Sequence, residues 1–171
     1  MQVAFLRGMN LGKRRVTNAQ LQELFEKAGC TEVATFQAAG NVLYGDGPAP
    51  AAIEGALRDG LGYEVPLYVR TAKELATVAK GGPFADAGEL TKPVSLHVVF
   101  FLAKVPAAVA KLSNDIDTLK PKGRELYWLA RQGMAEATID WKAVTKLCGG
   151  DPGTNRNINT VRKLAGKVAG S

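Results

Sequence analysis

The segment from Arg7 to Lys13, which reads RGMNLGK, combines residues that recognise anions. Arg and Lys supply positive charge, and glycines let backbone N–H groups approach an anion closely. A helix expected just after this segment places the positive end of its dipole here. We therefore interpret Arg7, Asn10 and Lys13 as a candidate site for a phosphate or carboxylate group. The alternative is a structural loop in which the glycines shape a turn, Asn10 bonds to nearby backbone and the bases are solvated.

Asn41, Arg156 and Asn159 extend this candidate site. Asn41 lies in a turn after the second predicted strand. In a βαββαβ sheet the first and second strands run parallel, so this turn and the loop after the first strand lie at the same end. Arg156 and Asn159 are three residues apart in a predicted terminal helix and would project together. They would join the site if that helix docks there, whereas the alternative for these residues is helix capping alone.

The net charge of +6 is carried by the two ends of the chain. The first fifteen residues contain four bases and no acid, and residues 151–171 contain four bases and one acid. If the ends meet in the fold, they form one basic surface. Weak contact with nucleic acid is therefore an alternative function, although the stacking aromatics of an RNA-recognition motif are absent. Nucleic-acid binding should fall steeply with salt, and binding in a pocket should not.

Residues suited to acid–base catalysis are few, so whether the protein is an enzyme stays open. The single histidine, His97, alternates with apolar residues in a predicted strand and has no catalytic partner nearby in the sequence. Asp115 and Asp117 share one strand face, which we interpret as a solvated edge. The sequence contains no G-x-S-x-G, P-loop or H-E-x-x-H motif. An enzyme of unrecognised chemistry is a third alternative.

The cysteines and the apolar runs indicate the compartment. Cys30 and Cys148 lie far apart and, with one histidine, are too few for a metal site. We expect a reduced, cytoplasmic setting, with no metal and no cofactor. The chain enters an apolar strand without a basic leader, and no apolar run approaches the roughly 20 residues of a membrane helix. No membrane contact is therefore expected.

The elements that must position these residues follow an α+β order. The first half predicts strands and helices at 2–6, 18–28, 31–37, 42–44, 50–61 and 63–70. This βαββαβ order predicts a ferredoxin-like sheet with two helices on one face. After a third helix, the second half predicts a related βαββα order and a terminal helix whose first turn holds residues 156–159. We expect two subdomains, 1–80 and 81–171, with the second packed against the first.

Four segments, in register over essentially the whole chain, resemble a known family: Leu6–Gly12, Gly40–Val42, Tyr63–Thr71 and Arg156–Thr160. The chain resembles the bacterial family catalogued as domain of unknown function 1697. The resemblance implies an α+β arrangement of ferredoxin-like parts and a cytoplasmic location, and it implies no established activity. Together with the basic loop, these observations favour a binding module for a small anionic ligand.

Overall fold

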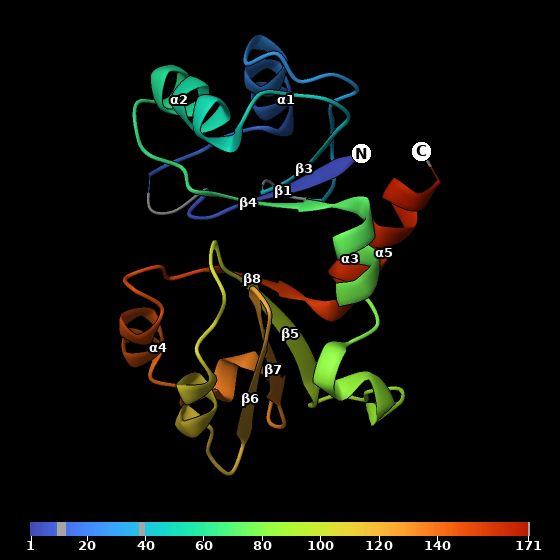
Figure 1. Cartoon of the computed structure of the whole chain (residues 1–171), viewed down its shortest axis with the longest axis vertical. Coiled ribbons are helices and arrows are strands. Elements are labelled where there is room, and N and C mark those ends of the chain that lie inside the picture. Colours follow the sequence, from blue (N-terminus) through green and yellow to red (C-terminus); the bar gives the residue numbers. More distant parts are fainter. Residues whose placement is uncertain (10–12, 38–39, 171) are drawn as a thin grey trace. The chain divides into compact units, whose positions relative to one another are not determined.

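The computed structural model describes residues 1–9, 13–37 and 40–170. The chain forms two compact units, of which unit 1 comprises Met1–Leu75 with Leu164–Ser171, and unit 2 comprises Ala76–Lys163. The fold is mixed α+β, and the described residues of each unit form a four-stranded antiparallel sheet (Figure 1). The two units are described in turn.

The described part of unit 1 follows a βαββαβ order. Its elements are β1 (Gln2–Leu6), α1 (Asn18–Lys27), β2 (Ala34–Thr35), β3 (Asn41–Tyr44), α2 (Pro50–Leu61) and β4 (Leu67–Thr71). The strands lie in the order β2-β3-β1-β4, so β1 is central. The end of β1 lies beside the start of β3, where the Leu6 N–H donates to the Gly40 carbonyl at 2.8 Å. The expected meeting of these two chain segments at one sheet end is confirmed.

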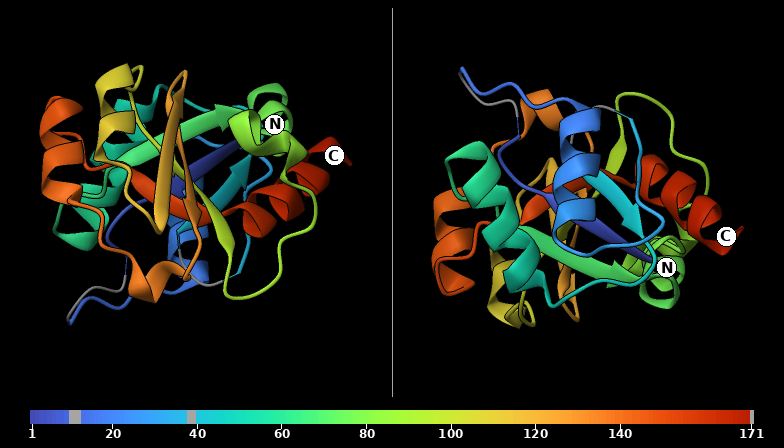
Figure 2. Two further views of the ribbon diagram at one scale, coloured as in Figure 1. Left: turned by 90° about the horizontal axis from the view of Figure 1, so that it is seen from below. Right: turned by 90° about the horizontal axis from the view of Figure 1, so that it is seen from above.

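The helices α1 and α2 cover one face of this sheet (Figure 2). Each buries a pair of apolar residues four positions apart, Leu21 and Phe25 in α1 and Ile53 and Leu57 in α2. This spacing places the two side chains on one helix face. They form a common core with alternate residues of the strands: Ala4, Leu6, Val42, Tyr44 and Leu67.

The strand expected over 31–37 is shorter than the sequence predicts. β2 contains Ala34 and Thr35, because Glu32 (φ 51°) and Gln37 (φ 59°) adopt left-handed backbone conformations on either side. A residue with such a φ cannot continue an extended ladder. β2 is therefore a two-residue edge strand.

The third helix begins with a reciprocal pair of hydrogen bonds. In α3 (Ala72–Val78) the Thr71 hydroxyl accepts from the Glu74 N–H at 3.1 Å, and the Glu74 carboxylate accepts from the Thr71 N–H at 2.9 Å. These reciprocal bonds form a capping box. A 3₁₀ segment, η1 (Gly82–Ala87), follows.

Unit 2 contains a second sheet with the strand order β6-β7-β5-β8. Its described elements are β5 (Ser95–Phe100), η2 (Ala107–Leu112), β6 (Asp117–Lys122), β7 (Glu125–Ala130), η3 (Met134–Glu136), α4 (Trp141–Leu147) and β8 (Thr154–Asn157). Figure 2 shows η2 and α4 over one face of this sheet. Val109 and Val144 from these helical segments pack with Val99, Leu126 and Trp128 of the sheet.

The strand β8 corrects the expected order of the second half. The sequence predicts residues 156–159 as the first turn of a helix, whereas Arg156 and Asn157 lie in a strand that pairs antiparallel with β5. The helix α5 (Ile158–Ala169) begins two residues later. Thr154–Asn157 is a polar segment, and the ladder hydrogen bonds to β5 outweigh its local preference for caps and turns.

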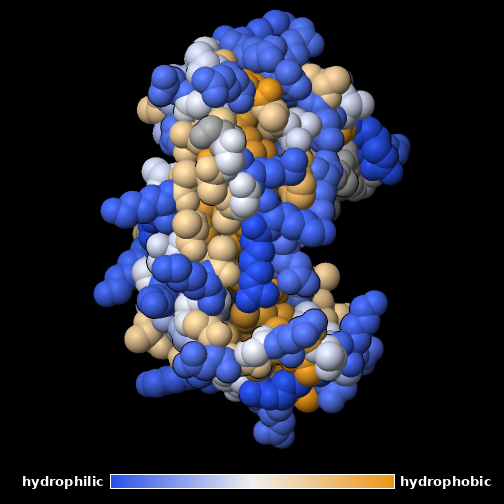
Figure 3. Space-filling model, turned by 90° about the vertical axis from the view of Figure 1, so that its right-hand side faces the viewer, coloured by the Kyte–Doolittle hydropathy of each residue, from blue (hydrophilic) through white to orange (hydrophobic). Residues whose placement is uncertain are grey.

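Most apolar side chains of the chain are withdrawn from solvent. Among the described residues, the large apolar side chains that are exposed are Leu102, Met134 and Leu147. On the face drawn in Figure 3 the protruding side chains are mostly hydrophilic. Among the described residues, no helix combines the length and apolar character needed to cross a membrane.

Candidate functional site

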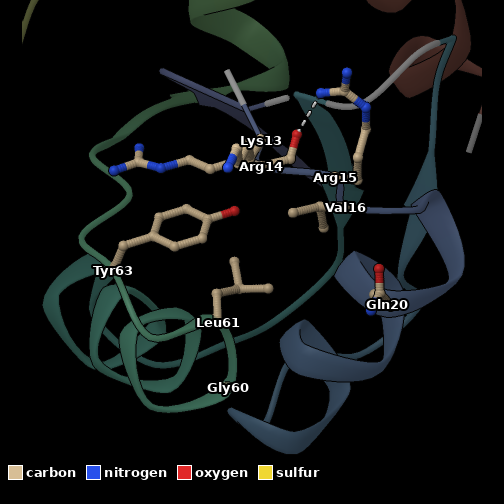
Figure 4. Close-up of a pocket in the computed structure, with 8 residues that line it drawn as sticks. All are labelled: Lys13, Arg14, Arg15, Val16, Gln20, Gly60, Leu61 and Tyr63. Atoms are coloured by element: carbon tan, nitrogen blue, oxygen red, sulfur yellow. Dashed lines mark hydrogen bonds between the residues drawn. The ribbon is translucent and has the colours of Figure 1, made fainter. Parts of the chain in front are cut away.

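A pocket of about 600 Å³ in unit 1 has a strongly basic lining (Figure 4). It is lined by Lys13, Arg14, Arg15, Val16, Gln20, Gly60, Leu61 and Tyr63. These residues come from the segment before α1, the first turn of α1, the end of α2 and the segment before β4. None of these lining residues is acidic. We call this cavity the Arg14 pocket.

Two contacts organise the basic side of the Arg14 pocket. The guanidinium carbon of Arg14 lies 4.1 Å from the centroid of the Tyr63 ring, which is a cation–π geometry. The Arg15 Nη1 donates to the Arg14 carbonyl at 2.8 Å. Lys13, Arg14 and Arg15 are all exposed, so their charges remain hydrated. Arg14 is therefore positioned by packing, and no buried carboxylate is needed to hold it.

The interior of the Arg14 pocket holds a hydroxyl group without a partner. The Tyr63 Oη is buried and has no hydrogen bond among the described residues. Figure 4 shows the Tyr63 ring lying across the pocket with its hydroxyl pointing toward Val16. Gly60 borders the pocket where a Cβ would overlap the Leu24 side chain, so a larger residue would force a rearrangement there. A ligand with an oxygen acceptor would supply the partner that Tyr63 lacks.

The beginning of α1 contributes less than the sequence suggests. The Thr17 hydroxyl accepts from the Gln20 N–H at 3.1 Å, and the Gln20 side chain accepts from the Thr17 N–H at 2.8 Å. These reciprocal bonds form a capping box with Thr17 as the N-cap. The capping box also occupies a backbone donor of the first turn that an anion would otherwise use. Side-chain charge must therefore dominate any anion recognition at this pocket.

Arg7 and Asn41, also predicted as site residues in unit 1, are not among the residues that line the pocket. Arg7 is exposed at the end of β1, and Asn10 lies outside the described residues. Asn41 is buried at the start of β3, and its Nδ2 donates to the Phe36 carbonyl at 3.2 Å. This bond explains Asn41 as a residue that holds the β2–β3 connection. Of the predicted residues, Lys13 lines the Arg14 pocket.

Arg156 and Asn159 belong to unit 2. The Arg156 Nη1 donates to the Thr154 hydroxyl at 2.9 Å and to the Asn155 carbonyl at 2.8 Å. Burial lowers the pKa of Arg156 to about 10, because desolvation penalises the charged form. The Asn157 side chain accepts from the Asn159 N–H at 2.8 Å, so the capping side chain at this helix start is that of Asn157. A single site with all six predicted residues stays a prediction.

Sequence reasoning missed a partner of His97. His97 is 4% exposed on β5, and its Nε2 lies 2.8 Å from the Ser95 Oγ. Its ring stacks on Trp128, with centroids 4.7 Å apart. Burial lowers the pKa of His97 and favours the neutral imidazole. Ser95 was detectable in principle, because residues i and i+2 of a strand share one face.

Asp117 contradicts the interpretation of a solvated edge. It is 1% exposed, and its carboxylate accepts from the Trp128 Nε1 at 2.8 Å and from the Thr138 N–H at 3.1 Å. A buried carboxylate needs such donors, and two are present. Asp117 therefore fixes Trp128 and the segment after η3 in place. Asp115 does not share this buried position.

A second basic pocket, of about 400 Å³, lies in unit 2. Lys104, Lys120 and Lys122 line it, and the Lys120 Nζ lies 4.8 Å from the centroid of the Phe84 ring. β6 is an edge strand, and lysine and proline on such a strand prevent pairing with other chains. This role explains Lys120 and Lys122, which lie on β6, without a ligand. Among the described residues, no group of three or more His, Cys, Asp and Glu side chains could hold a metal ion.

Comparison with known proteins identifies the family. A family profile described as "Protein of unknown function (DUF1697)" matches residues 1–127. The chain belongs to this family. The DUF1697 profile spans β1, the Arg14 pocket and most of the second sheet, so the family resemblance noted in the sequence is confirmed. No curated protein gives a significant match.

A solved structure shares the fold of this DUF1697 protein. It is that of the conserved bacterial protein SP0830 from Streptococcus pneumoniae, with a TM-score of 0.71 and 16% sequence identity. The similarity covers 98% of this chain and 97% of that one. At this level of identity the likeness concerns the fold, and the site must be argued from the residues of this chain.

Proposed function

We propose that this protein binds a small anionic ligand, bearing a phosphate or carboxylate group, in the Arg14 pocket. The observation that carries the proposal is the lining itself, in which three consecutive bases meet no acidic residue. An anion near Lys13, Arg14 and Arg15 gains charge-assisted hydrogen bonds, and Arg offers a planar pair of donors suited to phosphate.

The pocket is larger than inorganic phosphate requires. A volume of about 600 Å³ lies in the range of small-molecule sites. Val16, Leu61 and the Tyr63 ring supply apolar area for an organic body, and the buried Tyr63 hydroxyl, which has no partner among the described residues, would donate to a ligand oxygen once Arg14 has moved. In this arrangement Arg14 leaves the Tyr63 ring and pairs with the anion. The proposed ligand is therefore an organic phosphate or carboxylate, with inorganic phosphate as its minimal probe.

A weak nucleic-acid contact is the second candidate, and the observation that favours it is the net charge of +6. The dependence of affinity on salt concentration distinguishes nucleic-acid binding from binding of a small anion in the pocket. Affinity for a polyphosphate chain falls with a steep log–log slope, because each neutralised phosphate releases counterions. A single anion in a pocket depends on salt far less.

We also propose that the α+β fold consists of ferredoxin-like parts. The strand orders and the alternation of strands and helices support a ferredoxin-like unit 1 and a related unit 2. A boundary near residue 80 and a cytoplasmic location in a bacterium complete the proposal; Leu164–Ser171, expected within the subdomain 81–171, group with unit 1 instead. Expression of a tagged chain followed by cell fractionation would test the location.

The experiment for the anion site is isothermal titration with inorganic phosphate and with pyrophosphate at 0.15 M salt. We expect saturable binding that Arg14→Ala weakens at least about tenfold, because the variant removes the cation from the pocket. Arg7→Ala should weaken binding less, since Arg7 is not among the lining residues.

Lys120→Ala is the matched control. It also removes an exposed cation that lies over an aromatic ring, but in unit 2. An equal loss of affinity in Arg14→Ala and Lys120→Ala would indicate general electrostatics and contradict the pocket. So would the absence of binding to either phosphate.

A further inference from the structure

The second sheet contains two buried polar atoms without partners. They are the His97 Nδ1 on β5 and the Asn155 Oδ1 on β8. The register pairs His97 with Asn157 and Val99 with Asn155. Directly paired residues point to the same sheet face, so His97 and Asn155 are diagonal neighbours on one face. This separation is within reach of long and aromatic side chains.

Other atoms of the His97 and Asn155 side chains have contacts, and these contacts do not involve the two unpartnered atoms. The His97 ring is held by the 2.8 Å contact of its Nε2 with Ser95 and by stacking on Trp128. The Asn155 Nδ2 lies 3.4 Å from the Met134 Sδ. Neither contact uses the Nδ1 of His97 or the Oδ1 of Asn155.

An unpaired buried polar atom loses the hydrogen bonds it made with water, and native proteins leave few such atoms. Bound water or a ligand is the usual explanation. The Asn155 Oδ1 accepts hydrogen bonds, so its missing partner must donate. The Nδ1 of a neutral histidine donates or accepts according to the tautomer. A hydroxyl group can donate to Asn155 and accept from a protonated Nδ1 at the same time.

We propose that His97 and Asn155 together bind a hydroxyl group. The hydroxyl group belongs to a water molecule or to the alcohol of a small ligand. These two sources differ in the number of O–H groups that can donate a hydrogen bond. Water has two donors and satisfies Asn155 with either histidine tautomer. A ligand alcohol has one donor, so it requires His97 with the proton on Nδ1. Met134 is 56% exposed and contacts Asn155, so this flexible side chain connects the buried pair with the surface.

The single histidine makes the test direct, because ¹⁵N-histidine labelling gives the ring signals of His97 alone. The probes are solvent water and glycerol. A nuclear Overhauser effect between a ring proton of His97 and a long-lived water supports the site with water as its source. Saturable shifts of the ring signals on adding glycerol, with the Nδ1–H tautomer, support a ligand alcohol. Absence of both results overturns the proposal.

Asn155→Leu supplies a second readout, and Asn159→Leu is its matched control on an exposed position nearby. If a hydroxyl bridges the pair, Asn155→Leu changes the ring ¹⁵N shifts, lowers the urea midpoint and weakens any glycerol response at least about tenfold. Asn159→Leu leaves the ring shifts unchanged. If Asn155→Leu instead raises the midpoint and leaves the ring shifts as they are, the Asn155 Oδ1 had no partner and the proposal is wrong.

Discussion

The burial of His97 predicts a specific dependence of stability on pH. Burial lowers the pKa of His97 in the folded protein below 6.5, its ordinary value in the unfolded chain. At a pH between the folded and the unfolded pKa, His97 is therefore protonated in the unfolded chain and neutral in the folded protein. Stability from this residue is fully present above pH 6.5 and is lost as pH falls below it. Between pH 7.5 and 5 the loss reaches about 2 kcal/mol if the folded protein stays unprotonated, since each pH unit contributes about 1.4 kcal/mol.

The measurement is urea unfolding of the wild type and of His97→Gln at pH 7.5, 6 and 5. The other titrating groups are common to both proteins, and the chain has no second histidine, so the difference between the two curves isolates His97. We expect the wild type to lose up to about 2 kcal/mol more than the variant. His97→Gln should leave phosphate binding unchanged, because His97 does not line the Arg14 pocket.

Equal pH dependence in the two proteins would refute the reasoning, because it would mean that His97 titrates alike in the folded and unfolded states. If His97→Gln does not fold, the pKa of His97 is followed by NMR in the wild type. A midpoint at or above 6.5 would then contradict the effect of burial.

Three further predictions are tested by urea unfolding. Trp128→Phe should lower the free energy of unfolding by about 2 kcal/mol, because buried Asp117 loses the Nε1 donor; an unchanged value would mean that solvent reaches the carboxylate. Gly153→Ala should cost at least about 1 kcal/mol more than Gly149→Ala. Both glycines have positive φ, but a Cβ would lie 2.7 Å from a valine methyl at Gly153 and in open space at Gly149; equal costs would refute the steric argument. Tyr63→Phe should raise stability by about 1 kcal/mol without ligand, since it removes an unpartnered buried hydroxyl, and a fall would show that the hydroxyl has a partner.

The sequence was sufficient for the elements that carry their own signals. The first six elements followed from apolar periodicity and from a break at glycine, as at Gly29. A cap at Thr17 or Asn18 also followed from the sequence, and the structure shows Thr17 in that role, with Gln20 completing a local capping box.

What the sequence did not reveal depends on pairing across distance. β8 is a polar segment, and it is a strand because β5 supplies its hydrogen bonds. Asp117 looked solvated because its donors come from Trp128 and Thr138, at 11 and 21 residues' separation. The Arg14 pocket was found in part, through Lys13, because its other wall is the end of α2. Nothing in the local pattern of Leu61 or Tyr63 indicates that they face the segment before α1.

Unit 1 is formed by two separate stretches of the chain, and this has a consequence for folding during synthesis. Its last eight residues, Leu164–Ser171, are separated from Met1–Leu75 by the whole of unit 2. Within unit 1 the Lys167 Nζ lies 5.2 Å from the centroid of the Phe36 ring, a contact between these two stretches. A ribosome adds about 5–20 residues per second, so the segment with Phe36 waits several seconds for Lys167 to be synthesised. Unit 2 is a continuous stretch of chain and is complete first. Unit 1, although it begins at the N-terminus, is the last to acquire all of its contacts.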